Sequence, residues 1–184
     1  PAAPVILTSP PATSPGKGSP YIVTKWGRTG LWLSPPGALP GVLMSDRFPT
    51  FRAELAERYR SAGYWRDVLC DASLTSAAAT RGEARALVDR KGSMTWNELA
   101  TAVGDCATGL AALGIRHGDV VSWILPNWRE ATIAHWAILK IGAVSNPIVP
   151  IYRHREIRYI AGQAESSVVV IPSEFRGFDY SEML

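Results

Sequence analysis

Few residues of this sequence have the types and the spacing that chemistry requires. Its three histidines, His117, His135 and His154, are far apart, and neither they nor the cysteines have the spacing of metal ligands. His135 lies one turn after Ala131 on a mostly apolar predicted helix, which favours a hydrogen-bonded histidine of the core or its boundary over a catalytic one. Ser122 falls within a predicted strand rather than on a G-x-S-x-G turn, so it is a poor candidate nucleophile.

A cysteine and a basic cluster each admit a structural and a functional interpretation. Cys106 lies on the apolar stripe of a predicted helix, which favours a small buried residue over a reactive thiol. Cys70 and Cys106 are too few for a disulfide framework, so a reducing, cytoplasmic setting is expected. One group of basic side chains could bind an anion, although a solvated helix face needs no such role: Arg153, His154, Arg155 and Arg158.

Glycine-rich loops of the kinds that hold phosphate groups are missing from the patterned sequence. Neither G-x-G-x-x-G after a predicted strand nor G-x-x-x-x-G-K-[ST] occurs. Gly16-Lys17-Gly18-Ser19 faintly resembles the second pattern, but it lies in a proline-rich segment without a predicted flanking strand or helix. We therefore interpret this similarity as accidental. Residue chemistry alone predicts no assembled active site, and we assign no catalytic, cofactor-binding or metal-binding residue within the chain.

The charge balance argues against nucleic acid as a partner. The chain carries 19 Lys and Arg and 16 Asp and Glu, a net charge of +3. Lys17, Lys25 and Arg28 supply the whole excess, because residues 1–43 hold no acid and residues 44–184 hold 16 basic and 16 acidic residues. A folded part without a basic surplus has little with which to neutralise a phosphate backbone.

Length and composition are those of an ordinary folded protein. The 184 residues are 47% hydrophobic and 19% charged, which excludes a wholly disordered or collagen-like chain. The longest apolar runs, over 120–126 and 168–172, are far shorter than the ~20 residues of a membrane span. Residues 1–20 show no secretory signal, so we expect neither a transmembrane segment nor export.

The chain divides near Met44 into two parts of different character. Nine of the 14 prolines lie before Met44, and residues 1–43 show neither helical nor strand periodicity, so we predict a disordered or loosely attached tail. Trp26 and Trp32 could dock on a neighbouring protein, although their scattered placement favours an accidental occurrence of aromatic residues without a function. Because the chain begins with Pro1 and patterned sequence follows Met44 at once, one hypothesis places the natural start at Met44.

Patterned sequence begins with helices and one short strand. Phe48, Phe51, Leu55 and Tyr59 recur at helical spacing, and Gly63 ends this predicted helix. A second helix over about 69–80, a strand over 86–89 and a turn at 91–92 follow.

The next predicted helix has a clear beginning and end. Thr95 and Glu98 have the spacing of a capping box, in which each side chain accepts a hydrogen bond from the other residue's backbone N–H. Gly114 ends the helix after an apolar stripe with a period of 3.6 residues: Leu99, Ala102, Val103, Cys106, Leu110 and Leu113.

Strands and helices then alternate, which predicts an α/β fold with a parallel sheet, flanking helices and right-handed crossovers. Asn127 and Glu130 predict a second capping box, and Gly142 ends the helix that follows it. A site would lie at the carboxyl ends of the parallel strands, at 125–127 and 148–150. The predicted elements are strands over 120–125, 143–148 and 167–171 and helices over 128–141 and 153–164.

Several motifs in order resemble those of the adenylate-forming superfamily. Met94-Thr95-Trp96-Asn97-Glu98-Leu99 resembles its first core motif, [LY]-[ST]-[YW]-x-E-L, with Trp96 where Tyr is usual. About 40 residues later, Leu139-Lys140-Ile141-Gly142-Ala143-Val144 with Asn146-Pro147 resembles the second, L-K-x-G-A followed by a strand and N-P. The region between them matches the family's linking pattern: Leu113-Gly114-Ile115, Gly118-Asp119-Val120-Val121 and Pro126-Asn127.

The resemblance covers about residues 44–184, the whole patterned region. Residues 155–170 look like the next helix and strand of the family. Residues 59–67 resemble the leader of its acid-activating members, both aryl-acid AMP ligases and alicyclic or fatty acid–CoA ligases.

What the resemblance implies is an AMP-forming acid–CoA ligase that uses ATP, Mg²⁺ and coenzyme A on a fatty, alicyclic or aryl carboxylic acid. In the family, the chemistry belongs to a Ser/Thr/Gly-rich loop with Lys, a downstream acid that binds the ribose, and a Lys in a mobile C-terminal lid. None of these motifs occurs before Leu184, so both core motifs present here are interpreted as structural. We expect a fragment that is inactive alone and lacks the C-terminal portion of its own domain.

Two other functions remain as alternatives. A truncated copy could persist as a non-catalytic binding or interaction module derived from such an enzyme. A flavodoxin-like nucleotide-binding domain fits the order of the elements, but it would need a phosphate-cradling loop that the sequence lacks.

Overall fold

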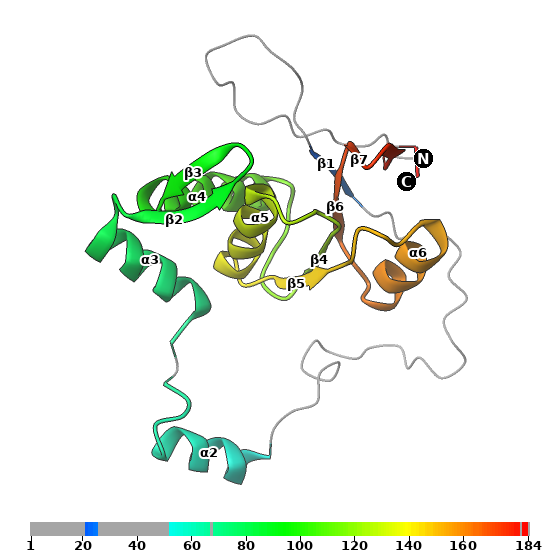
Figure 1. Cartoon of the computed structure of the whole chain (residues 1–184). Helices are drawn as coiled ribbons and strands as arrows, with labels where there is room; N and C mark the ends of the chain where they lie inside the picture. Colours follow the sequence, from blue (N-terminus) through cyan, green and yellow to red (C-terminus); the bar gives the residue numbers. More distant parts are fainter. Residues whose placement is uncertain (1–20, 26–51, 67, 181, 184) are drawn as a thin grey trace.

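The computed structural model describes residues 21–25, 52–66, 68–180 and 182–183 (Figure 1). Their helices and strands follow one another along the chain as β1 (Tyr21–Lys25), α2 (Ala53–Ser61), α3 (Cys70–Arg81), β2 (Arg85–Asp89), β3 (Gly92–Thr95), α4 (Trp96–Ala112), β4 (Val120–Trp123), α5 (Arg129–Lys140), β5 (Val144–Pro147), α6 (His154–Gln163), β6 (Val168–Pro172), β7 (Glu174–Phe175) and β8 (Phe178–Asp179).

The centre of the fold is a four-stranded sheet in the order β1-β6-β4-β5. Strand β4 is parallel to both β5 and β6, with Val121 opposite Ser145 on one side and Val168 on the other. Helices α5 and α6 connect these strands, as expected for parallel strands. The prediction of a parallel α/β sheet with flanking helices is therefore confirmed.

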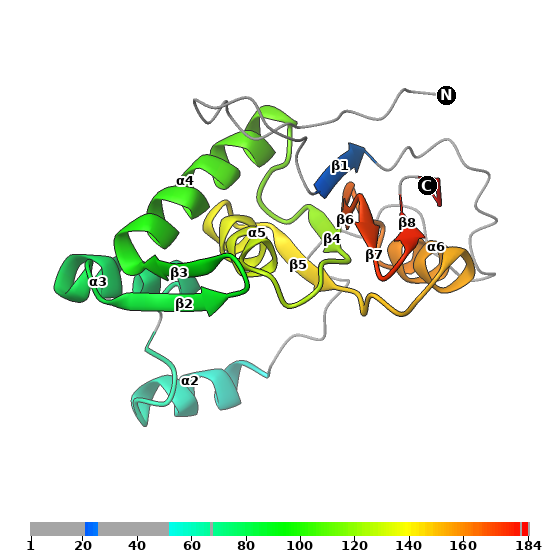
Figure 2. The same ribbon diagram turned by 45° about the horizontal axis from the view of Figure 1, so that its top comes forward.

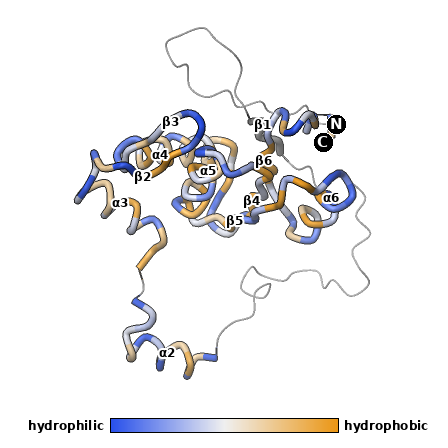
Figure 3. Tube along the Cα trace, in the orientation of Figure 1, coloured by the Kyte–Doolittle hydropathy of each residue, from blue (hydrophilic) through white to orange (hydrophobic). Residues whose placement is uncertain are grey.

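Helices cover both faces of this sheet (Figure 2). Alternate residues of β6 divide between two hydrophobic clusters, because successive side chains of a strand point to opposite faces. Val168 and Val170 pack with α4 and α5, whereas Val169 and Ile171 pack with α6. Figure 3 shows the hydrophobic character of β6, and all five of its residues are buried. The sheet thus separates a larger core under α4 and α5 from a smaller one under α6.

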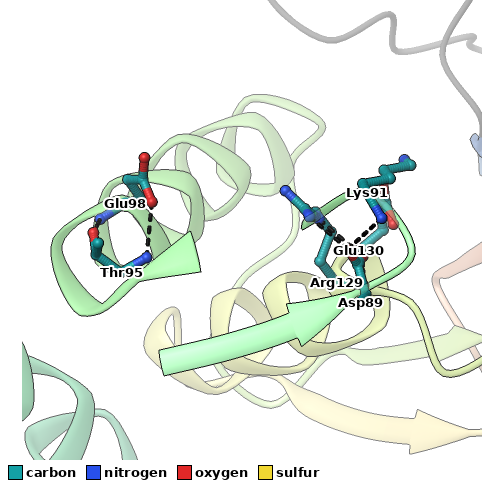
Figure 4. Close-up of polar contacts among 6 residues, drawn as sticks. All are labelled: Asp89, Lys91, Thr95, Glu98, Arg129 and Glu130. Atoms are coloured by element: carbon teal, nitrogen blue, oxygen red, sulfur yellow. Dashed lines mark hydrogen bonds and ion pairs between the residues drawn. The ribbon is translucent and has the colours of Figure 1, made fainter. Parts of the chain in front are cut away.

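Helix α4 begins as its sequence predicts. The Thr95 hydroxyl accepts a hydrogen bond from the backbone N–H of Glu98 at 3.2 Å, and the Glu98 carboxylate accepts one from the N–H of Thr95 at 2.7 Å (Figure 4). Gly114 follows the helix with a φ of 88°, a left-handed conformation that glycine adopts without strain. The stripe that faces the core is also confirmed, with Leu99, Val103 and Leu110 buried.

The amino-terminal half differs from its prediction at several points. Tyr21–Lys25 forms a strand, although the segment 1–43 was expected to lack regular structure; this short run combines aromatic and β-branched residues, which favour strands. The turn after Asp89 leads into β3, so the single predicted strand is one half of a hairpin. Several residues named in the sequence analysis lie outside the described residues: Trp26, Trp32, Met44, the hypothetical start, Phe48 and Phe51.

A membrane-spanning helix would need a longer apolar stretch than any helix in the described part of the chain provides.

Candidate functional site

The carboxyl ends of β4 and β5 lie side by side, where the sequence places a possible site. The N–H of Ile148 donates to the carbonyl oxygen of Trp123 at 2.8 Å, which holds the two strand ends together. Leu125, Pro126 and Ile148 are buried in the loops that follow. These ends therefore present mainly apolar groups to the core and few polar groups to a ligand.

An open groove of about 510 Å³ runs beside these strand ends, between the β2–β3 hairpin and α5. Its lining is largely apolar and includes two tryptophans, with three polar residues from α5 and the loop before it. The groove is lined by Leu87, Val88, Asp89, Trp123, Asn127, Trp128, Ala131, Thr132, His135 and Pro147.

His135, one of the residues that line this groove, is held by hydrogen bonding. Its Nδ1 lies 2.8 Å from the Ser145 hydroxyl, which also accepts a hydrogen bond from the indole N–H of Trp123 at 2.8 Å. The ring is half-buried. His135 is therefore a hydrogen-bonded boundary histidine, in agreement with the structural interpretation of its sequence position.

Ser122 belongs to a second polar cluster and is fully buried in the sheet. Its hydroxyl oxygen lies 2.6 Å from that of Ser166 and accepts a hydrogen bond from the side-chain amide of Asn146 at 2.8 Å. A buried hydroxyl needs such partners to offset its lost hydration. These contacts link β4, β5 and the segment just before β6, so the cluster stabilises the sheet from within.

Asp89, at the end of β2, joins the hairpin to the beginning of α5 (Figure 4). Its carboxylate accepts hydrogen bonds from the Arg129 guanidinium, at 2.9 Å from Nε, and from the Arg129 backbone N–H at 3.3 Å. The hydrogen bond from Arg129 is the main reason that the pKa of Asp89 lies well below its usual value of 3.8. Lys91 and Glu130 form an adjacent ion pair. We call these two pairs the hairpin clamp.

The hairpin clamp corrects the prediction of a second capping box at Asn127 and Glu130. Trp128 is the residue that precedes α5, and no side chain caps the helix from this position. Glu130 is then the second residue of the helix and pairs with Lys91 instead. The carboxylate at the helix N-terminus comes from Asp89, 40 residues earlier in the chain, which no local pattern could reveal.

The basic cluster on α6 does not assemble as a single anion site. The Arg153 guanidinium donates to the carbonyl oxygens of Pro150 and Tyr152 at 3.0 and 2.8 Å and lies 4.1 Å above the Phe178 ring. This arginine thus ties the loop after β5 to the β7–β8 hairpin, while the other three basic residues are exposed on the helix: His154, Arg155 and Arg158.

The thiols and acids of the described residues show no further grouping for catalysis. Cys106 is half-buried, and this burial raises the pKa of its thiol to about 11. Within 21–25, 52–66, 68–180 and 182–183, no three His, Cys, Asp or Glu side chains gather closely enough to hold a metal ion.

Comparison with known proteins relates this chain to a family of enzymes. A family model described as "AMP-binding enzyme" matches residues 74–182. The 2-hydroxy-7-methoxy-5-methyl-1-naphthoate–CoA ligase of Streptomyces carzinostaticus is 35% identical over 71% of this chain and 23% of its own length. Salicyl-AMP ligase / salicyl-S-ArCP synthetase of Mycobacterium tuberculosis is 32% identical over 82% of this chain and 26% of its own length.

A solved structure agrees with these matches. The apo structure of MbtA from Mycobacterium smegmatis is similar with a TM-score of 0.63 and 38% sequence identity, over 67% of this chain and 23% of that chain. The chain spans about a quarter of the length of the relatives that it matches. Since the family model matches more than half of the chain, the protein belongs to the AMP-binding enzymes of the adenylate-forming superfamily.

Proposed function

We propose that this chain is the N-terminal part of an ATP-dependent, AMP-forming carboxylic acid–CoA ligase. In this reaction a carboxylate oxygen attacks the α-phosphorus of ATP, and the bond to pyrophosphate breaks to leave an acyl-adenylate. The thiolate of coenzyme A then attacks the acyl carbon and releases AMP. The family match over residues 74–182 is the observation that supports this proposal. The acid is fatty, alicyclic or aryl.

The contribution of the described residues to this reaction is structural. The loops over 124–128 and 148–153, at the carboxyl ends of β4 and β5, contain neither glycine nor lysine, and their one arginine, Arg153, donates to the backbone carbonyl oxygens of Pro150 and Tyr152. They therefore do not fit a triphosphate, which needs closely approaching backbone N–H groups or cations. Nor do the described acids gather to hold Mg²⁺. We infer that ATP, Mg²⁺ and coenzyme A are bound by residues that the relatives carry outside the matched quarter.

Acid-dependent exchange of radiolabelled pyrophosphate into ATP tests both parts of this proposal. The assay is run on the purified 184-residue chain and, in parallel, on the product of the whole reading frame that encodes it. The acids are salicylate, benzoate, cyclohexanecarboxylate and octanoate. Thioester formation is then measured with coenzyme A and, separately, with an aryl carrier protein.

We expect exchange with at least one acid by the longer product, none by the 184-residue chain, and thioester formation with coenzyme A. Exchange by the 184-residue chain alone would refute its structural role. Transfer only to the carrier protein would replace coenzyme A as the acceptor. If the longer product shows no exchange with any acid, the ligase proposal is wrong and the non-catalytic binding module is favoured. The same conclusion follows if the reading frame ends at Leu184 and its protein product shows no exchange.

A further inference from the structure

Helix α2 lies apart from the sheet and from the other described helices (Figures 1 and 2). None of its nine residues is buried, and no other described helix or strand packs closely against it. By contrast, α3, which begins at Cys70, packs on α4 and α5. An isolated helix shorter than about 12 residues is marginal in water, because most helical stability in proteins comes from tertiary packing. Helix α2 therefore needs a surface that the described residues do not provide.

The side chains of α2 divide into an apolar and a polar face, as is typical of a helix that packs on a partner. Leu55 and Tyr59, about one turn apart, lie on the apolar face and are half-buried. Tyr59 lies against the rings of Tyr64 and Trp65, with ring centroids 6.3 and 5.4 Å away. Glu57 is exposed on the opposite face. The apolar face thus continues into the residues that follow α2.

Three large apolar side chains between α2 and α3 are exposed. Tyr64 and Leu69 are each 77% exposed, and Val68 is 64% exposed. Single exposed apolar residues are ordinary, whereas several close together are typical of an interaction surface. We call residues 53–66, 68 and 69 the α2 segment. Its apolar face and these exposed side chains lie on one stretch of chain that leads directly into α3.

The α2 helix is shared with a much longer relative. The match to the salicyl-AMP ligase of Mycobacterium tuberculosis covers 82% of this chain, a share too large for the residues after α2 to supply, so it includes α2. The same match covers only 26% of that enzyme. A helix that is retained without a partner in the matched quarter is expected to have its partner surface in the remainder of such a protein.

We infer that the α2 segment is a docking element, whose apolar side packs on the part of the same polypeptide that follows Leu184. Because Leu69 leads into α3, this contact fixes the downstream part against the core under α4 and α5. The inference rests on one part of the proposed function, that the chain is the N-terminal part of a longer protein. It does not rest on ligase activity.

Hydrogen exchange followed by mass spectrometry tests this contact. The 184-residue chain is compared with the same chain continued past Leu184 to the end of its reading frame. Residues 53–61 should exchange at least about tenfold more slowly in the longer protein, because docking adds protection that the shorter chain lacks. Exchange of α4 should be slow in both, which shows that both are folded. The pyrophosphate assay is run on the same longer protein, so that docking and activity are measured separately.

Leu55→Ala and Glu57→Ala form a matched pair in the longer protein. Alanine favours helices at both positions, so the two variants differ in the face of α2 that they change. Leu55→Ala should speed the exchange of α2 by about tenfold, whereas Glu57→Ala should leave it unchanged. In the 184-residue chain, neither variant should change the exchange of α2 appreciably.

Equal exchange of α2 in the two proteins would overturn the inference, and so would a reading frame that ends at Leu184. Protection of α2 that rises with the concentration of the 184-residue chain would also overturn it, because a second copy would then be the occupant. Equal effects of Leu55→Ala and Glu57→Ala would contradict docking through the apolar face. Protection of α2 without pyrophosphate exchange would support the contact while refuting the ligase proposal, and exchange without protection would do the reverse.

Discussion

Replacing Thr95 by alanine tests whether the first core motif of this family serves here to begin a helix. Thr95→Ala removes the hydroxyl that accepts the hydrogen bond of the Glu98 N–H at 3.2 Å. The reciprocal bond, from the Thr95 N–H to the Glu98 carboxylate at 2.7 Å, does not need the threonine side chain. One capping interaction is therefore lost, which costs about 1 kcal/mol of unfolding free energy. The midpoint of thermal unfolding, followed by circular dichroism, should fall by about 4 °C.

Two further variants separate capping from a general effect of the substitution. Thr95→Ser keeps the hydroxyl and should unfold close to the wild-type midpoint. Thr101→Ala, on the exposed face of the same helix, removes a hydroxyl that donates to the carbonyl oxygen of Asn97 at 2.9 Å, but this bond adds no cap and its loss should be nearly neutral. Equal midpoints for Thr95→Ala and Thr101→Ala would refute the structural interpretation of the motif.

Three other predictions concern the core, the hairpin clamp and the thiols. Leu110→Ala should cost about 2–5 kcal/mol in urea unfolding, since Leu110 is only 3% exposed within the larger core, and a loss below about 1 kcal/mol would contradict this packing. Asp89→Asn should be less stable than wild type at neutral pH. Arg129 lowers the pKa of Asp89 in the folded state, so the ionised carboxylate stabilises the fold above its usual pKa of 3.8. The difference in unfolding free energy between the two proteins should therefore shrink as the pH falls below this value. A stability difference independent of pH would be inconsistent with the ion pair. The pKa of Cys106 is raised to about 11, so at pH 8 it should carry about a hundredfold less thiolate than a thiol of pKa 9.0. It should therefore react slowly with a disulfide reagent, whereas the exposed Cys70 should react first. Comparable reaction rates of the two thiols would argue against burial of Cys106.

The elements after residue 94 could be predicted because their sequence signals are local. The capping box at Thr95 and Glu98 and the left-handed glycines at Gly114 and Gly142 act within one or two turns of chain. The largely buried runs of β4 and β6 are equally short-range signals. These signals fixed the order of helices and strands, and with it the parallel sheet.

The contacts that sequence analysis missed join residues far apart in the chain. Asp89 and Arg129 are 40 positions apart, and either could have been an ordinary surface charge. The wrong capping prediction at Asn127 followed from the same limitation, because the carboxylate at the start of α5 comes from the hairpin. The groove beside His135 likewise depends on how the hairpin packs on α5, which periodicity does not describe.

The order of strands in the sheet also bears on how the chain folds as it is synthesised. Strand β4 can pair with β5 soon after both leave the ribosome, but its other edge must wait for β6, which follows α6. Contacts between distant segments form slowly because a long loop must close first. Strand β1 leaves the ribosome before all of these elements, whereas its partner β6 follows β4 and β5 in the sequence. The first described strand to be synthesised can therefore join this sheet only after β6 has been made, and until then its five residues lack the partner strand with which they pair in the folded chain.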